Sequence, residues 1–128
     1  MDNISISLLE GGRTEISEIR VDGVIDTLTA TQLEDVLDSL LKRDRYKIVV
    51  DLAGVDYISS AGWGIFISHI KDVRARDGDI KLASMIDNVF EIYELLEFDN
   101  VLSAYASVDE ARNAFGGSGD DQKKKSEG

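Results

Sequence analysis

The sequence has 128 residues, of which 43% are hydrophobic and 30% charged, a length and composition that fit one folded domain and argue against wholesale disorder. It contains no cysteine, and this excludes disulfides, thiolate metal sites and thiol catalysis. The formal net charge of −11 disfavours nucleic acid and anionic membrane surfaces as partners, because both repel an acidic protein.

Two strands joined by a glycine turn are predicted near the amino terminus. Apolar and polar residues alternate over residues 4–8 and again over 18–22, and Gly11 and Gly12 lie between the two runs. Alternation is the pattern of a strand with one buried face. We therefore expect the chain to begin with a hairpin.

Helical and strand patterns alternate in the rest of the chain up to residue 115. Thr29 and Gln32 have the spacing of a capping box, and the apolar residues after them follow one helical stripe to about Arg43. The apolar run within residues 46–52 lacks alternation, as expected of a strand covered on both faces. The remaining patterns predict a helix that Ser59 or Ser60 caps and Gly78 ends, a strand over 80–83, a helix over 89–96, a strand over 101–105, and a last helix that Ser107 and Glu110 open. This order predicts an α/β fold with a mixed five-stranded sheet and about four helices.

The end of the chain has a different composition. Residues 116–128 begin with Gly-Gly-Ser-Gly and continue with charged residues that have no apolar period. We expect one domain over residues 1–115 and a disordered polar tail over 116–128, to which we assign no function. No signal peptide and no run able to span a bilayer is recognisable, so we expect a cytoplasmic protein.

The most informative segment leaves the buried strand at Asp51 and enters the second helix at Ser59 and Ser60. A serine at that place can act simply as an N-cap, whose side chain accepts a hydrogen bond from a backbone N–H. The same position also suits a phosphate, because a helix start offers unpaired N–H groups and the positive end of the helix dipole. Phosphorylation would add roughly −1.5 to −2 charges to the surface. The residues alone leave both interpretations open.

Three stretches carry a resemblance to a known family. The stretch Val49-Val50-Asp51-Leu52 through Tyr57-Ile58-Ser59-Ser60-Ala61-Gly62 resembles the phosphorylation-site segment of anti-sigma factor antagonists, in the STAS domain family. Gly23-Val24-Ile25-Asp26 is similar to the family's Gly-x-Leu-Asp segment, and residues 92–98 are similar to a late family segment. The resemblance covers about residues 3–115.

By this resemblance Ser60 falls on the family's phosphoacceptor serine, and Ser59, the second choice, falls where many members carry aspartate. Trp63 replaces a usual leucine. The implied protein is a binding module, not an enzyme, that takes no cofactor and no metal. In its unphosphorylated form it would bind an anti-sigma factor, which is often itself a serine kinase, and so release the sigma factor. Phosphorylation would end that binding. We also expect a serine phosphatase as a partner. The resemblance places the partner-binding residues on one edge of the sheet: Asp26, Ser59, Ser60, Gly62 and Trp63.

Several of these residues also have simpler interpretations. Asp26 can be a turn or cap residue. Trp63 can pack in the core or contact a partner, and we expect a contribution to binding if its ring is exposed. Gly62 and Gly64 are expected to allow close packing near the helix start.

Three other functions would use residues of this sequence in different ways. A serine hydrolase needs a base beside its nucleophile, and His69, nine residues after Ser60, lies about 13 Å away along a helix. A phospho-aspartate receiver would use Asp51, yet the acidic pair and the lysine that hold Mg²⁺ and phosphate in a receiver are missing. A STAS scaffold in a larger signalling assembly that does not act on a sigma factor stays open as the alternative function.

Overall fold

The computed structural model describes residues 4–10 and 15–115. The predicted glycine turn at Gly11 and Gly12 and the predicted tail over 116–128 lie outside the described residues. The five strands are β1 (Ile4–Glu10), β2 (Ile16–Ile25), β3 (Lys47–Ile58), β4 (Asp79–Ala83) and β5 (Ser103–Tyr105). The helices are α1 (Ala30–Lys42), α2 (Ser60–Ala75), α3 (Asp87–Leu95) and α4 (Val108–Phe115), with a 3₁₀ turn, η1 (Phe98–Asn100). The predicted fold class and element order are confirmed.

The strands form one mixed sheet in the order β1-β2-β3-β4-β5. β1 pairs antiparallel with β2, and the other neighbouring pairs are parallel. The carboxyl ends of β2 and β3 therefore lie at the same edge, where each strand leads directly into a helix.

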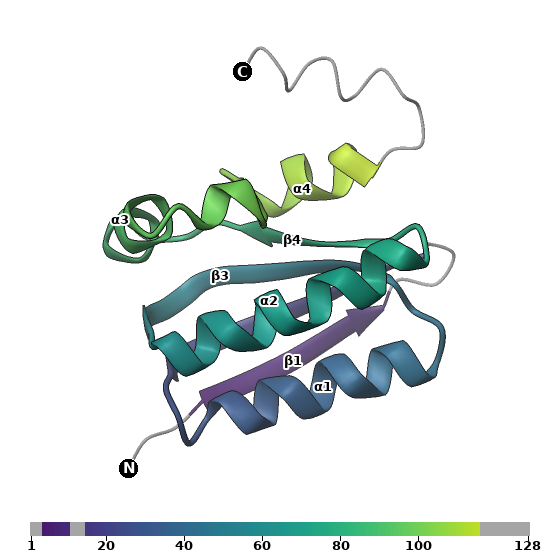
Figure 1. Ribbon diagram of the computed structural model, residues 1–128, viewed down its shortest axis with the longest axis horizontal. Coiled ribbons are helices and arrows are strands. Elements are labelled where there is room, and N and C mark those ends of the chain that lie inside the picture. The colour runs from purple at the N-terminus through teal and green to yellow at the C-terminus, as the bar shows by residue number, and fades with distance from the viewer. Residues whose placement is uncertain (1–3, 11–14, 116–128) are drawn as a thin grey trace.

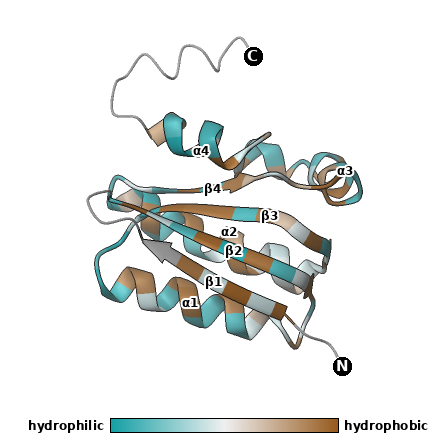
Figure 2. Cartoon of the chain, turned by 180° about the vertical axis from the view of Figure 1, so that it is seen from behind, coloured by the Kyte–Doolittle hydropathy of each residue, from teal (hydrophilic) through white to brown (hydrophobic). Residues whose placement is uncertain are grey.

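Two helical layers cover the sheet unequally. α1 and α2 lie side by side across one face, while α4 lies beyond β4 on the opposite side (Figure 1). Seen from behind, α4 overlies only the β4 side of the molecule and leaves β1 and β2 uncovered by helices (Figure 2). The larger core cluster packs under α1 and α2, and a smaller one of Val49, Ala83 and Ala111 lies under α4. Of the helices in the described ranges, none combines the length and apolarity that crossing a bilayer requires.

The third strand extends beyond its predicted end near Leu52. Its pairing with β2 continues through Gly54 opposite Asp22 to Ile58 opposite Ile25, with two register shifts on the way. The apolar run that predicted the strand ends near Leu52, but pairing with a distant strand extends the strand beyond that run. The extension carries the chain directly to Ser59.

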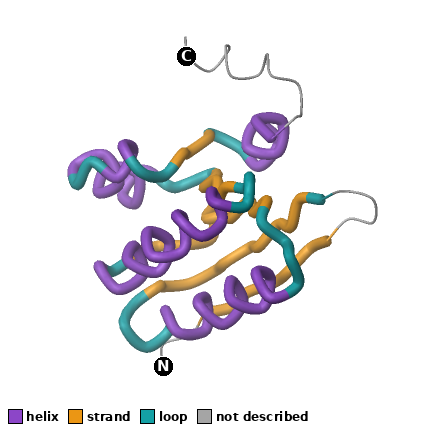
Figure 3. Tube along the Cα trace, turned by 45° about the vertical axis from the view of Figure 1, so that its right-hand side comes forward, coloured by secondary structure: helices purple, strands orange, loops and turns teal. Residues whose placement is uncertain are grey.

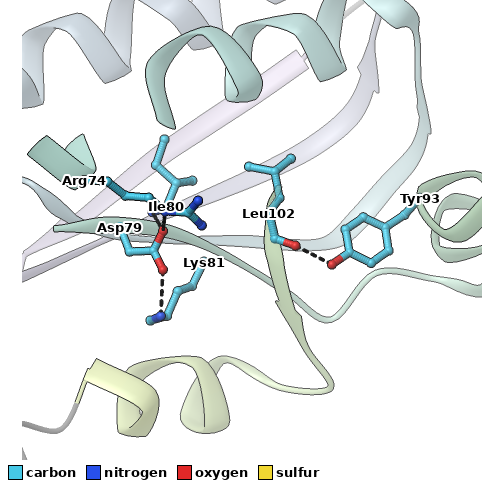
Figure 4. A network of polar contacts seen from close by, with 6 residues as sticks. All are labelled: Arg74, Asp79, Ile80, Lys81, Tyr93 and Leu102. Atoms are coloured by element: carbon cyan, nitrogen blue, oxygen red, sulfur yellow. Dashed lines mark hydrogen bonds and ion pairs between the residues drawn. The ribbon is translucent and has the colours of Figure 1, made fainter. Parts of the chain in front are cut away.

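A polar network lies on the α4 side of the sheet. The Asp79 carboxylate accepts hydrogen bonds from Arg74 Nε at 3.0 Å and Lys81 Nζ at 2.9 Å (Figure 4). The Lys81 ammonium lies 4.7 Å from the centre of the Phe115 ring, and only 8% of the residue is exposed. The pairing with Asp79 and the aromatic ring make this buried cation tolerable.

Candidate functional site

The turn before α1 and the start of α2 meet at the carboxyl edge of the sheet. Val24 pairs with Tyr57 in the register of β2 and β3, and the Ser59 backbone N–H donates a 2.8 Å hydrogen bond to the Ile25 carbonyl. The two helices that follow run next to each other (Figure 3). The structure therefore brings the Gly23-Val24-Ile25-Asp26 segment next to the two serines.

The two serines have different structural roles. Ser59 has an extended backbone and is the N-cap of α2, and its hydroxyl accepts a 3.3 Å hydrogen bond from the Gly62 N–H. Ser60 is the first residue of the helix, it is exposed, and its hydroxyl has no hydrogen-bond partner within residues 4–10 and 15–115. The capping interpretation therefore applies to Ser59. Ser60 presents an unengaged hydroxyl at the helix start.

Asp26 organises the turn that leads into α1. Its carboxylate accepts 3.0 Å hydrogen bonds from the N–H groups of Leu28 and Thr29, and its own N–H donates to the Thr29 hydroxyl at 2.8 Å. This is a reciprocal capping box of Asp26 and Thr29. The predicted box of Thr29 and Gln32 is wrong, because the Thr29 hydroxyl donates to the Val24 carbonyl at 2.7 Å and does not cap α1.

The same bonds lower the pKa of Asp26 below its ordinary value of 3.8, chiefly through the hydrogen bond from the Thr29 backbone. The carboxylate is therefore ionised and places a negative charge beside the serines. The cap interpretation of Asp26 is correct, and all of these hydrogen bonds to its carboxylate use Oδ1. A contact with a partner stays a prediction.

The two glycines of the first turns of α2 differ. A Cβ at Gly62 would lie 2.6 Å from Ile25 Cγ2 and 2.8 Å from Ile58 Cγ2, so close packing against the sheet requires glycine there. A Cβ at Gly64 would meet nothing within 4 Å, so the packing role expected for that glycine is wrong. Gly62 itself is buried and supports the site from below.

Trp63 lies in the core, where only 2% of the residue is exposed. Its ring packs against Phe98 and Tyr93 at centroid distances of 5.0 and 6.1 Å and joins α2 to the α3 region. Its indole Nε1 is buried without a hydrogen-bond partner in the described part of the chain. The predicted partner contact depended on an exposed ring, and in this structure the ring is not exposed.

Two apolar side chains at this edge were not singled out from the sequence. Leu28, in the turn before α1, is 73% exposed, and Tyr57, at the end of β3, is 55% exposed. Apolar residues in a turn and at a strand end give a weak sequence signal, because such positions are often solvated and carry no periodicity. The Leu28 backbone N–H donates to the Asp26 carboxylate, and Tyr57 pairs with Val24, two residues before Asp26.

The residues that the rival functions would use are engaged elsewhere. His69 is buried in α2 and bonds Asp38 and the Ile65 carbonyl, and no hydrogen bond joins it to either serine. The Asp51 carboxylate accepts a 3.0 Å hydrogen bond from the Ala53 N–H. Neither residue is paired with the exposed hydroxyl of Ser60.

Comparison with known proteins gives consistent results. The model of the STAS domain family matches residues 12–111. An anti-sigma-B factor antagonist of Listeria monocytogenes is 29% identical over 100 residues, which cover 78% of this chain and 87% of that relative.

Solved structures share the fold at lower identity. An anti-sigma factor antagonist from Mycobacterium paratuberculosis superposes with a TM-score of 0.76 at 20% identity, covering 89% of this chain and 95% of that one. Unphosphorylated SpoIIAA, a Bacillus protein, gives a TM-score of 0.69 at 16% identity over 89% of this chain and 100% of its own. Sequence match and fold agree over most of the chain, which belongs to the STAS domain family.

Proposed function

We propose that this protein is an anti-sigma factor antagonist whose partner binding is switched by phosphorylation of Ser60. In its unphosphorylated form it would bind an anti-sigma factor that is also a serine kinase, and so free a sigma factor. The observation that carries the proposal is the exposed, unbonded hydroxyl of Ser60 beside the Asp26 turn. Relatives named as anti-sigma factor antagonists and the solved phosphorylated form of SpoIIAA support it.

The binding surface that we propose combines apolar and acidic groups. Leu28 and Tyr57 offer exposed apolar area, and the same two segments carry the carboxylates of Asp26 and Asp56. Such a surface fits an anti-sigma factor that presents an apolar pocket with a basic rim. Gly62 and Trp63 would act from beneath this surface by holding the first turn of α2.

A phosphate on Ser60 would act chiefly through its charge. Residues 22–31 and 55–64 contain no lysine, arginine or histidine, so neither segment supplies a cation to pair with the phosphate. The phosphate would therefore remain at the surface, near the N–H groups at the start of α2, and add to the charge of Asp26 and Asp56. A partner shaped for a moderately acidic surface would be repelled or left with unpaired polar groups.

Ser60→Asp tests this proposal. We expect it to fold as wild type, because an acidic residue in the first turn of a helix is favourable, and yet to weaken partner binding at least tenfold. Ser60→Ala should bind as wild type and resist phosphorylation. Ser39→Asp, which adds the same charge at an exposed position late in α1, is the matched control and should leave binding unchanged.

The partner is obtained by pull-down from the native lysate with unmodified protein, and affinities are then measured by calorimetry. Incubation with the recovered kinase and peptide mass mapping would locate the phosphate. A phosphate on Ser59 with Ser60 untouched would overturn the residue assignment. Recovery of a large assembly of homologous proteins, with no kinase and no effect of Ser60→Asp, would favour the scaffold function instead.

A further inference from the structure

Three ligand-type side chains converge between α1 and α2, away from the serine edge. Glu34 and Asp38 are one turn apart on α1, and His69 faces them from α2. One ligand atom from each lies within 4.8 Å of the other two. The two helices are neighbours over this stretch (Figures 1 and 3).

The imidazole of His69 is held in a defined orientation. Its Nδ1 lies 2.8 Å from the Ile65 carbonyl oxygen, which can only accept, so Nδ1 carries the proton of that bond. Its Nε2 then points toward the Asp38 carboxylate, at 2.9 Å from Oδ1. A metal-ligating histidine usually donates its other ring N–H to a carboxylate, a backbone carbonyl or water, and the Ile65 carbonyl fills that place here.

A simple ion pair between His69 and Asp38 accounts for only part of this cluster. Glu34 lies beside the pair and forms no hydrogen bond or ion pair with a side chain elsewhere in residues 4–10 and 15–115. Two carboxylates thus share one imidazole, which can carry at most one positive charge. A divalent cation would balance the cluster better than a single proton.

We propose that Glu34, Asp38 and His69 form a binding site for one divalent transition-metal ion, with Zn²⁺ as the best match. One imidazole nitrogen and two carboxylate oxygens are ligands that Zn²⁺ accepts, and water would complete the coordination. The side chain of Asp38 is 50% exposed and that of His69 only 8%, so the site opens to solvent on the α1 side and is closed on the α2 side. This departs from the expectation of no metal drawn from the sequence.

The distances suit such an ion after a small movement of side chains. Two ligands around one ion at roughly 2.1 Å each can lie at most about 4.2 Å apart. The three ligand atoms lie within 4.8 Å of one another, and His69 Nε2 and Asp38 Oδ1 are 2.9 Å apart, so a rotation of the half-exposed Asp38 carboxylate can admit an ion between the ligands without movement of the backbone. A bound ion would join α1 to α2 and stabilise the folded state, because the unfolded chain does not hold the three ligands together.

Zinc binding by the untagged full chain tests the proposal, with competition against a fluorescent chelator as the measure of affinity. We expect one Zn²⁺ per chain for wild type and a loss of affinity of at least tenfold in Glu34→Gln/Asp38→Asn. Asp35→Asn, which removes one charge from an exposed position on the same helix, should bind as wild type. Both variants change surface carboxylates and should fold.

A second readout reports on the ligand itself. His69 is the only histidine of the chain, so every imidazole proton signal in an NMR spectrum belongs to it. Those signals should shift when Zn²⁺ is added to wild type and should stay in place in the double variant. Zinc bound equally well by both proteins, unmoved imidazole signals, or no binding to wild type up to about 1 mM Zn²⁺ would overturn the proposal. None of these results depends on a partner or on Ser60, about 13 Å away along α2.

Discussion

Replacing Gly62 with alanine tests whether close packing fixes the first turn of α2 against the sheet. The new Cβ would lie 2.6 Å from Ile25 Cγ2 and 2.8 Å from Ile58 Cγ2, well inside the ~3.5–4.0 Å of a normal carbon contact. Both methyl groups belong to buried β-branched side chains, which have little rotamer freedom. Overpacking costs about 1–3 kcal/mol, and the better helix propensity of alanine returns at most ~1 kcal/mol. With mid-range values of about 2 and about 1 kcal/mol for these two effects, we expect the free energy of unfolding to fall by about 1 kcal/mol.

Gly64→Ala is the matched control two residues further along the same helix. It adds the same methyl group where nothing lies within 4 Å, so only the propensity gain applies, and we expect stability to rise by about 0.5–1 kcal/mol. Urea denaturation followed by circular dichroism, with equal m-values for the three proteins, gives both changes. If Gly62→Ala were as stable as wild type, or if both variants changed stability in the same direction, the packing argument would be refuted.

Three further predictions concern the site and its support. Ser59→Ala should lower the free energy of unfolding by about 1 kcal/mol, because it removes the side-chain cap of α2, whereas Ser60→Ala should leave that free energy nearly unchanged. Equal losses of stability in urea denaturation would contradict the assignment of the cap to Ser59 alone. The single tryptophan, Trp63, should emit at short wavelength in the native protein and at longer wavelength after unfolding, and binding of a partner should not move the native emission. Burial raises the pKa of Tyr93, whose hydroxyl donates to the Leu102 carbonyl (Figure 4), from its ordinary 10.0 to about 12. The folded state holds this proton to higher pH than the unfolded chain, so the free energy of unfolding of wild type should fall between about pH 10 and 12, and that of Tyr93→Phe should fall less. If the free energies of unfolding of the two proteins fell equally with pH over that range, Tyr93 would not be the cause.

Local patterns were sufficient for most of the fold. The apolar stripe of α1 and the alternation in β1 and β2 each express which face of one element is buried, and such patterns repeat every few residues. The extension of β3 to Ile58 could not be read in the same way. It depends on pairing with β2, about thirty residues earlier, and on irregular register near Gly54.

The details of the site depended on tertiary geometry. Thr29 followed by Gln32 has the spacing of a capping box, but Thr29 exchanges its hydrogen bonds with Asp26, in a turn that the end of β2 positions. Spacing alone cannot distinguish two overlapping boxes. The burial of Trp63 likewise depends on Tyr93 and Phe98, which reach it from elements some thirty residues further along.

The same limit applies to the proposed metal ligands. Glu34 and Asp38 have the i, i+4 spacing that places two side chains on one face of a helix, and this much is visible in the sequence. His69 is separated from Asp38 by 31 residues, and only the packing of α1 against α2 brings the two together. A sequence-based search for clustered ligands therefore finds two carboxylates, which are common on exposed helices, and not the third ligand.

The arrangement of the two serines would let the proposed charge switch operate without unfolding the protein. Ser59 maintains the helix start through its side-chain and backbone bonds, and Gly62 and Trp63 fix the same turn from the core side. Ser60 contributes none of these contacts, so a phosphate on its hydroxyl would leave the cap and the core in place. A modification at Ser59 would instead compete with the cap bond to Gly62 and would carry a stability cost. If Ser60 is the acceptor, phosphorylated and unphosphorylated protein should therefore unfold at nearly the same urea concentration while differing in affinity for the partner. A large loss of stability on phosphorylation would point to Ser59 as the modified residue.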